Sequence, residues 1–295
     1  MWIGNMNGIL SVLKPPGMTS HDVVSQIRKI TGIKKVGHTG TLDPGAAGVL
    51  PICIGKATKI VDFIMNDIKT YICELTLGNR TDTYDRYGSF IFEENRDISS
   101  IGYDSLENVI HEFIGHISQR PPAFSAKKID GVRAYELARR GETVELPEKQ
   151  VTIYEIKILK FSLPTVMMEI KCSKGTYIRS ICNDIGEKLG CGGYMSFLIR
   201  TSTGKFNLSN SYILDEINRD NFNKFMVTPD YALDMKSLYV DDMFSKKILN
   251  GNSVYITGGT SYKEDERVKV YIKPNDFVGI GTVQKGILHM EKLLI

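Results

Sequence analysis

The sequence predicts an α+β fold that is followed by a small β-barrel. Segments with strand alternation and segments with helical spacing are mixed along the first part of the chain, without the regular strand–helix repeat of a doubly wound α/β fold. From about Ser237 the chain changes to short strand-like runs separated by Gly, Asn and Pro turns, which is typical of a small barrel. We therefore expect two domains, at residues 1–236 and 237–295.

The chain begins with a predicted strand and a capped helix. Residues 8–14 form an apolar run that ends in a Pro-Pro-Gly turn. Thr19 and Asp22 have the spacing of a capping box. The next apolar residues follow at helical spacing, and Gly32 is a natural helix stop.

Periodicity also predicts the elements in the middle of the chain. Residues 71–77 alternate, which places Tyr71 on the apolar face of a strand. Residues 105–115 predict an amphipathic helix that is capped by Ser105 and ended by Gly115. Residues 151–161 and 166–172 predict strands, and a helix follows the turn at Gly175.

Composition narrows the class of protein. The 295 residues carry a net charge of +3, which is compatible with a nucleic-acid partner but does not require one. The five cysteines include no CxxC pair, so we interpret them as buried thiols in a reducing compartment. The N-terminus is a poor signal peptide, and no run approaches the roughly 18 apolar residues of a membrane span. We expect a cytoplasmic protein without a membrane partner.

Several common sites are excluded by spacing. Gly48 to Thr58 has six residues between its glycines and Ala57 after Lys56, so it is not a phosphate-binding P-loop. Residues 279–286 lack the third glycine of a dinucleotide fingerprint, and there is no G-x-S-x-G motif. The histidines are scattered. We expect no cofactor and no metal.

One carboxylate, Asp43, stands alone in the loop GHTGTLDPGAAGVLPICIG, which contains no Lys, Arg or Glu. Pro44 pushes Asp43 into an extended backbone, and Pro44-Gly45 suits the centre of a type II turn. The small neighbours would let a planar ligand approach. Viewed locally, Asp43 is either a turn former that bonds its own backbone or a catalytic acid, and the local pattern favours the turn former.

Six stretches in order carry a resemblance to a known family. They are LKPPGMTSHDVV, GHTGTLDPGAAGVLP, TYICELTLGNRTDTYDRYG, RPPAFSAKK with GVRAYELARRG, CSKGTYIRSIC and FLIRTSTGKF. Together they closely resemble the TruB-type tRNA pseudouridine synthases of bacteria, over roughly residues 8–235. The resemblance implies a pseudouridine synthase fold with a central mixed, largely antiparallel sheet, and a PUA-like RNA-binding barrel. It also implies an enzyme that isomerises uridine-55 in the T loop of tRNA.

The resemblance assigns three catalytic residues. Asp43 matches the catalytic aspartate, and Arg179 matches the arginine that pairs with it and holds it ionised. Tyr71 matches the tyrosine that stacks on the flipped base and helps to remove the C5 proton, although its apolar face also fits a core position. Whether Asp43 acts as a nucleophile or as a base stays open.

Other positions are expected to bind substrate or to support the site. His38 matches a histidine that helps to extrude the target base, and Tyr177 is either a pocket aromatic or a core residue. Lys14 and Pro15 match a motif that buttresses the active-site loop. Phe124 departs from the family, which often has Tyr there, without consequence for the chemistry.

A basic segment at about residues 119–142 is the expected RNA-binding insertion. Its cations would contact phosphates, and the alternative is a solvated helix face. Asp82 and Asp85 could pair with arginines or shape a loop, and we assign no chemistry to them. The insertion residues expected to bind RNA are Lys127, Lys128, Arg133, Arg139 and Arg140.

The partner expected from the resemblance is the T-arm stem-loop of tRNA, bound by a monomer without guide RNA. Two alternatives stay open. One is a guide-RNA-dependent pseudouridine synthase, and the other is a tRNA-binding or RNA-folding protein that does not depend on catalysis.

Overall fold

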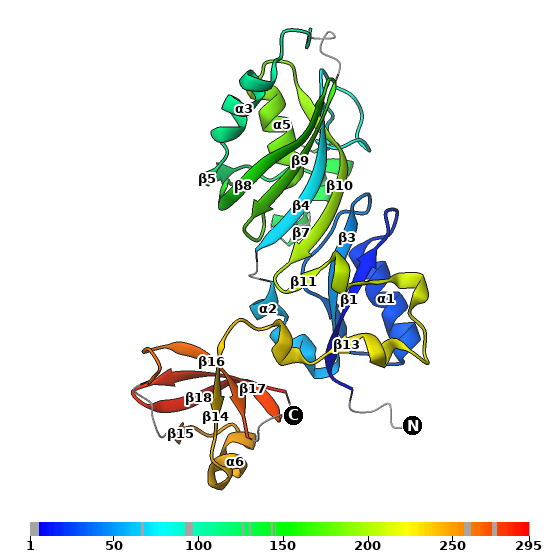
Figure 1. Ribbon diagram of the computed structural model, residues 1–295. Coiled ribbons are helices and arrows are strands. Elements are labelled where there is room, and N and C mark those ends of the chain that lie inside the picture. Colours follow the sequence, from blue (N-terminus) through cyan, green and yellow to red (C-terminus); the bar gives the residue numbers. More distant parts are fainter. Residues whose placement is uncertain are drawn as a thin grey trace.

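A computed structural model describes residues 6–65, 68–91, 97–125, 127–129, 131–142, 144, 146–256, 261–272 and 276–294 (Figure 1). The first elements in chain order are β1 (Gly8–Lys14), α1 (Ser20–Thr31), β2 (Val36–His38), β3 (Ala47–Ile54), the 3-10 helix η1 (Gly55–Ile60), α2 (Val61–Ile64), β4 (Lys69–Leu77), α3 (Tyr103–His111) and β5 (Gly115–Gln119). The next are β6 (Lys128–Ile129), β7 (Val132–Arg133), α4 (Ala134–Arg139), β8 (Lys149–Ser162), β9 (Thr165–Cys172), α5 (Ile178–Lys188) and β10 (Gly193–Thr203).

The remaining elements are short. They are β11 (Phe206–Asn207), η2 (Leu208–Asn210), β12 (Tyr212–Ile213), η3 (Leu214–Glu216), η4 (Phe222–Phe225), β13 (Met226–Val227), η5 (Pro229–Ala232), β14 (Lys236–Tyr239), α6 (Asp242–Leu249), β15 (Val254–Tyr255), β16 (Glu266–Tyr271), β17 (Phe277–Gln284) and β18 (Ile287–Leu293).

One large sheet organises the chain up to β13. Its strand order is β12-β1-β3-β10-β4-β9-β8-β5, and β2, β11 and β13 pair at its side. Strand β1 is parallel to β12, and β3 is parallel to β10, whereas the other pairs are antiparallel. The prediction of an α+β fold with a mixed, largely antiparallel sheet is confirmed.

The two ends of this sheet are covered differently. Strand β4 alternates strictly, and its buried face packs into the core that includes α3 and α5. Strands β1 and β3 are buried on both faces, because α1 covers one face and the η1–α2 segment lies on the other. Figure 1 shows β4 and β10 running between the α3–α5 end and the α1 end, so the strands of the sheet centre join both halves.

The C-terminal part forms a second sheet with the order β14-β16-β17-β18-β15. It packs against the η1–α2 segment: Lys59 Nζ donates to the Leu293 carbonyl at 2.6 Å, and Arg267 lies 5.3 Å from the centre of the Phe63 ring. Ile280 and Leu294 share an apolar cluster with Ile60 and Ile64 of that segment. A small C-terminal β unit is confirmed, but because the cluster spans both parts, the boundary between residues 236 and 237 stays a prediction.

The helix-capping predictions from the sequence are confirmed for α1 but not for α3. Thr19 and Asp22 form the capping box, and Gly32 ends α1 with a φ of 71°. Ser105 does not cap α3, because Gly102 occupies the N-cap and the Ser105 hydroxyl instead donates to the Gly102 carbonyl. Helix α6 lies in a region for which the sequence pattern predicts strands and turns. No helix among the described residues is long and apolar enough to cross a membrane.

Candidate active site

Asp43 lies in the loop between β2 and β3, and the backbone on both sides of it is fastened. The Ser20 hydroxyl, at the start of α1, accepts from the Leu42 N–H at 2.8 Å and donates to the Leu42 carbonyl at 3.1 Å. On the other side, the Gly17 N–H donates to the Pro44 carbonyl at 2.8 Å. The side chain of Asp43 therefore starts from a fixed position.

The turn at Asp43 differs from the predicted one. The Ala46 N–H donates to the Asp43 carbonyl at 3.0 Å, which closes a four-residue turn around Pro44-Gly45. Gly45 is not among the described glycines with a positive φ, so the prediction of a type II turn is wrong. Gly45 instead lies directly against the Tyr87 ring: a Cβ at position 45 would lie 2.0 Å from Cε2 of Tyr87, so this exposed side chain would have to move to accommodate it.

Lys14, at the end of β1, also holds the Asp43 loop and is only 1% exposed. Its ammonium donates to the carbonyls of Pro15, Met18 and Pro44 at 2.8, 2.7 and 3.2 Å. Burial lowers the pKa of Lys14 to about 8, while the nearby Asp43 acts in the opposite direction. Lys14 thus ties the turn after β1 to the residue that follows Asp43.

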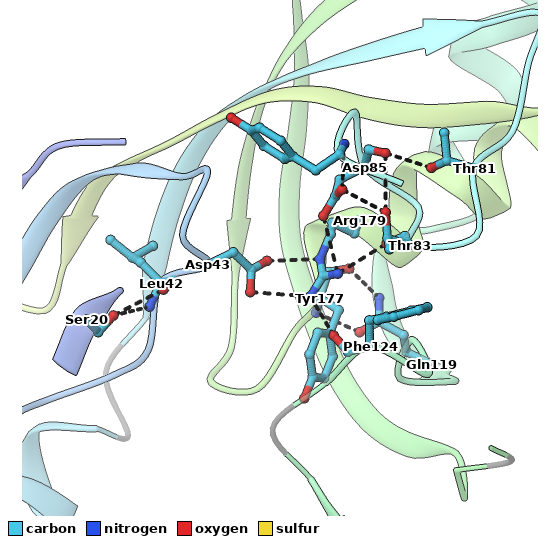
Figure 2. A network of polar contacts seen from close by, with 11 residues as sticks. Ser20, Leu42, Asp43, Thr81, Thr83, Asp85, Gln119, Phe124, Tyr177 and Arg179 are labelled. Carbon is cyan, nitrogen blue, oxygen red and sulfur yellow. Dashed lines mark hydrogen bonds and ion pairs between the residues drawn. The ribbon is translucent and has the colours of Figure 1, made fainter. Parts of the chain in front are cut away.

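Arg179, in the first turn of α5, meets Asp43 with two nitrogens. Its Nε lies 2.9 Å from Asp43 Oδ2, and its Nη2 donates to Oδ1 at 3.3 Å (Figure 2). Two contacts between a planar guanidinium and one carboxylate fix both position and orientation. The Arg179 side chain is 6% exposed and that of Asp43 is 38% exposed, so the arginine is enclosed while the carboxylate is open to a ligand.

A second carboxylate lies on the far side of the same guanidinium. Arg179 Nη1 is 3.4 Å from Asp85 Oδ2, and Asp85 Oδ1 accepts from the Thr83 hydroxyl at 2.8 Å and from the Tyr87 N–H at 3.0 Å. Figure 2 shows Arg179 between the two acids. Of the two roles that the sequence left open for Asp85, pairing with an arginine or shaping a loop, the structure shows the pairing with Arg179.

The guanidinium of Arg179 also donates hydrogen bonds to two backbone carbonyls. Nη1 donates to Thr83 O at 3.1 Å and Nη2 to Phe124 O at 3.3 Å. Phe124 lies within the predicted RNA-binding insertion, so the side chain of Arg179 contacts both Asp43 and the insertion. Because the Phe124 contact uses the backbone, it does not depend on the hydroxyl that Tyr would add.

Tyr71 projects from the buried face of β4 and is 7% exposed. Burial raises the pKa of Tyr71. Directly opposite it on β10 stands Arg200, which is 1% exposed and which sequence reasoning missed, although it lies in the stretch FLIRTSTGKF. Among the described residues, no group of three or more His, Cys, Asp and Glu could hold a metal ion.

Comparisons with known proteins agree with this geometry. Residues 28–178 match the TruB family pseudouridylate synthase (N terminal domain), and residues 179–227 match the tRNA pseudouridylate synthase B C-terminal domain. The chain belongs to the TruB family of pseudouridylate synthases. Asp43, Tyr71 and the Asp85 loop all lie in the first match, and Arg179 begins the second.

Similar proteins cover nearly the whole TruB-family chain. The "tRNA pseudouridine synthase B" of Caldanaerobacter subterraneus subsp. tengcongensis is 46% identical over 98% of this chain and 99% of that protein. The protein of the same name from Clostridioides difficile is 49% identical over 95% of both chains. Among solved structures, a chain of a Cbf5-Nop10-Gar1 complex superposes with a TM-score of 0.73 at 26% identity, over 98% of this chain and 85% of that one. A chain of an H/ACA RNP bound to a substrate RNA shares the fold, with a TM-score of 0.72 at 24% identity over the same shares.

Two of the residues expected to bind substrate in this TruB-family chain are held by hydrogen bonds, His38 by a neighbouring backbone group and Tyr177 by the side chain of Gln119. The Gly40 N–H donates to His38 Nδ1 at 3.3 Å, and burial lowers the pKa of His38. The Tyr177 N–H and carbonyl are both bound by the Gln119 amide, at 2.8 and 3.0 Å. Gln119 was missed by sequence reasoning, and it joins the end of β5 to the residue before α5.

Most of the described Lys and Arg residues of the basic insertion are exposed. Arg133 and Arg139 flank the Tyr135 ring at 5.9 and 5.4 Å from its centre, and Arg140 lies 4.0 Å from Glu142. Burial, followed by the charge of Lys149, lowers the pKa of Lys127. The side chain of Lys128 lies outside the described residues.

Proposed function

We propose that this TruB-family enzyme converts uridine-55 in the T loop of tRNA to pseudouridine, without guide RNA. The observation that carries the proposal is the Asp43–Arg179 pair, in which an open carboxylate is held by a buried guanidinium. The relatives named "tRNA pseudouridine synthase B" support tRNA as the substrate, because they align with this chain over almost their full length.

The proposed reaction breaks the N1–C1′ bond of uridine, turns the base and rejoins it through C5. Asp43 promotes the departure of the base from C1′, since it is the carboxylate that a ligand can reach. Arg179 holds the Asp43 carboxylate in a fixed orientation through two of its nitrogens. Tyr71 contacts the base and accepts its C5 proton. A general base must lie within hydrogen-bond reach of the proton that it removes, and contact with the base provides this.

RNA binding is assigned to two features outside this centre. The exposed cations of the insertion contact phosphates and give a salt-dependent affinity, while the specificity comes from the target loop. His38 helps to extrude the uridine, a step that costs a few kcal/mol of unstacking. The carbonyl contact from Arg179 to Phe124 supports a link between RNA held by the insertion and the catalytic pair.

The decisive experiment measures tritium release from C5-labelled uridine in an unmodified tRNA transcript, with purified enzyme and no other RNA. We expect one tritium released per tRNA, and none from a transcript that carries cytidine at position 55. Asp43→Asn serves as the matched enzyme control. Tight tRNA binding without release would favour the RNA-binding alternative, and release only after a second RNA is added would favour the guide-dependent one.

A further inference from the structure

Arg200 is a buried cation for which the mechanism above has no role. It lies on β10 between β3 and β4, directly opposite Gly48 on one side and Tyr71 on the other. Side chains of directly opposite residues in an antiparallel pair lie on the same face and within reach of each other. At 1% exposure, Arg200 is among the largest fully buried side chains.

The guanidinium of Arg200 is bound by neutral groups. Its Nε donates to the Val49 carbonyl at 2.7 Å, and its Nη2 donates to the Gly40 carbonyl at 3.2 Å. Within the described part of the chain it has no carboxylate within 4.0 Å. Burying an arginine without a counter-ion costs free energy. Because no carboxylate neutralises it, the positive charge of Arg200 acts on the other groups around it.

Tyr71 lies directly opposite this charge across the β4–β10 strand pair. The groups that face Tyr71 are Arg200 from β10, Asp43 from its loop, Cys172 from β9 and, on the same face of β4, Lys69. Burial raises the pKa of Tyr71, and Cys172 and Asp43 act in the same direction. Arg200 acts in the opposite direction through its charge and through a hydrogen bond to the hydroxyl.

We propose that Arg200 is a positioning residue that directs the Tyr71 hydroxyl and stabilises its phenolate for removal of the C5 proton. This inference rests on the proposed function. After C5 has bonded to C1′, the ring holds an N1=C6 double bond. The Tyr71 phenolate takes the proton from C5, the C5–H electron pair forms the C5=C6 bond, and the N1=C6 electron pair moves onto N1. N1 then takes a proton from water and Tyr71 returns its proton to water, so the step is a balanced tautomerisation.

The same arginine also fixes the loop that carries Asp43. Gly40, whose carbonyl it binds, lies three residues before Asp43. A purely structural Arg200 would therefore slow every step, including N1–C1′ cleavage. A positioning Arg200 slows C5 proton removal selectively, and this difference can be measured.

The test is single-turnover conversion of tRNA that carries either hydrogen or deuterium at C5 of the target uridine, with Arg200→Gln and Arg200→Lys. Proton removal in Arg200→Gln should fall by about 10- to 100-fold, as expected when a hydrogen bond from a charged donor is removed. The variant should then show a primary deuterium isotope effect larger than that of the intact enzyme. Its rate should recover as pH rises, because a higher pH restores the phenolate. Arg200→Lys keeps the charge and should show a smaller isotope effect than Arg200→Gln.

Ser20→Ala is the matched control, because it loosens the Asp43 loop at Leu42 without changing the charge near Tyr71. It should slow turnover without raising the isotope effect. A slow Arg200→Gln enzyme with the isotope effect and pH profile of the intact enzyme would overturn the inference. If Arg200→Gln does not fold, the same criterion applies to Arg200→Met, which also removes the charge. Failure of the intact enzyme to release C5 tritium would instead refute the proposed function.

Discussion

Arg179 and Arg200 are two buried arginines of the candidate active site, and they have different kinds of partner. Arg179 is enclosed by two carboxylates and two carbonyls, whereas Arg200 meets two carbonyls and Tyr71. The desolvation cost of Arg179 is offset by ion pairs, so its charge serves to hold Asp43 and Asp85. The charge of Arg200 has no such partner and acts on a neutral hydroxyl. The site thus stabilises the Asp43 carboxylate beside Arg179 and, by our inference, the Tyr71 phenolate beside Arg200.

The largest expected effect comes from removing the anion that Arg179 holds. Asp43→Asn keeps the size of the side chain and the Ala46–Asp43 turn bond, which uses only the backbone. Turnover should fall below detection, while the thermal melting temperature and tRNA affinity stay near those of the intact enzyme. The measurement is single-turnover pseudouridine formation at saturating tRNA. Near-normal turnover would mean that Asp43 is only a turn former.

Arg179→Ala should be the next most severe change. It leaves Asp43 and Asp85 without their common counter-ion, and removing one partner of a buried ion pair costs about 3–5 kcal/mol. If that cost falls on the transition state, the rate drops by about 10²- to 10³-fold or more. Single-turnover rates will show the decrease, and Arg179→Lys should recover only part of it because an ammonium lacks the planar two-nitrogen contact. Full activity of Arg179→Lys would show that charge alone suffices.

Asp85→Asn separates the two carboxylates that share Arg179. It removes the charge at 3.4 Å from Nη1 but keeps an oxygen that can accept from Thr83 and Tyr87. A hydrogen bond to a charged partner is worth about 1.5–3 kcal/mol, so we expect a rate about 10- to 100-fold lower. The matched control is Asp82→Asn in the same loop, whose carboxylate accepts from the Ser89 N–H rather than from Arg179. Equal decreases in both variants would mean that loop geometry, and not the ion pair, is what matters.

These contacts also show what the sequence could reveal. Asp43 and Arg179 stand out because one is a lone acid in a bland loop and the other follows a recognisable motif. For Asp85 the sequence suggests an arginine partner but not which one, and for Arg200 it suggests nothing. Both partners are set only when the Arg80–Ser89 loop folds over α5 and β10 pairs with β4. The turn at Gly45 was predicted incorrectly for a similar reason. The prediction used Pro44-Gly45 alone, whereas the Pro44 carbonyl is held by the Gly17 N–H and by Lys14, both from the end of β1 and the turn that follows it.

The cations of the RNA-binding insertion should affect tRNA affinity and not the chemical step, unlike the two buried arginines. Replacing Lys127, Arg133, Arg139 and Arg140 by Gln should weaken tRNA binding and leave single-turnover conversion at saturating tRNA within a few-fold of normal. The slope of log affinity against log salt should flatten by about 0.7–0.9 for each phosphate that the variant no longer neutralises. Filter binding over a range of salt concentrations measures this slope. An unchanged slope would identify the insertion as a solvated surface.

The smallest expected effect is that of Phe124→Tyr, which restores the residue often found in the family. Arg179 reaches position 124 through the backbone carbonyl, at 3.3 Å from Nη2, so the ring contributes nothing to that bond. An added hydroxyl leaves the Asp43 contacts unchanged, and turnover should stay within about twofold of the intact enzyme, a change of under about 0.5 kcal/mol. Steady-state kinetics with unmodified tRNA provide the measurement. A several-fold change in kcat would show that the ring at position 124, and not only its carbonyl, acts on the Arg179–Asp43 pair, and the contrast between the two buried arginines would then have to include this side chain.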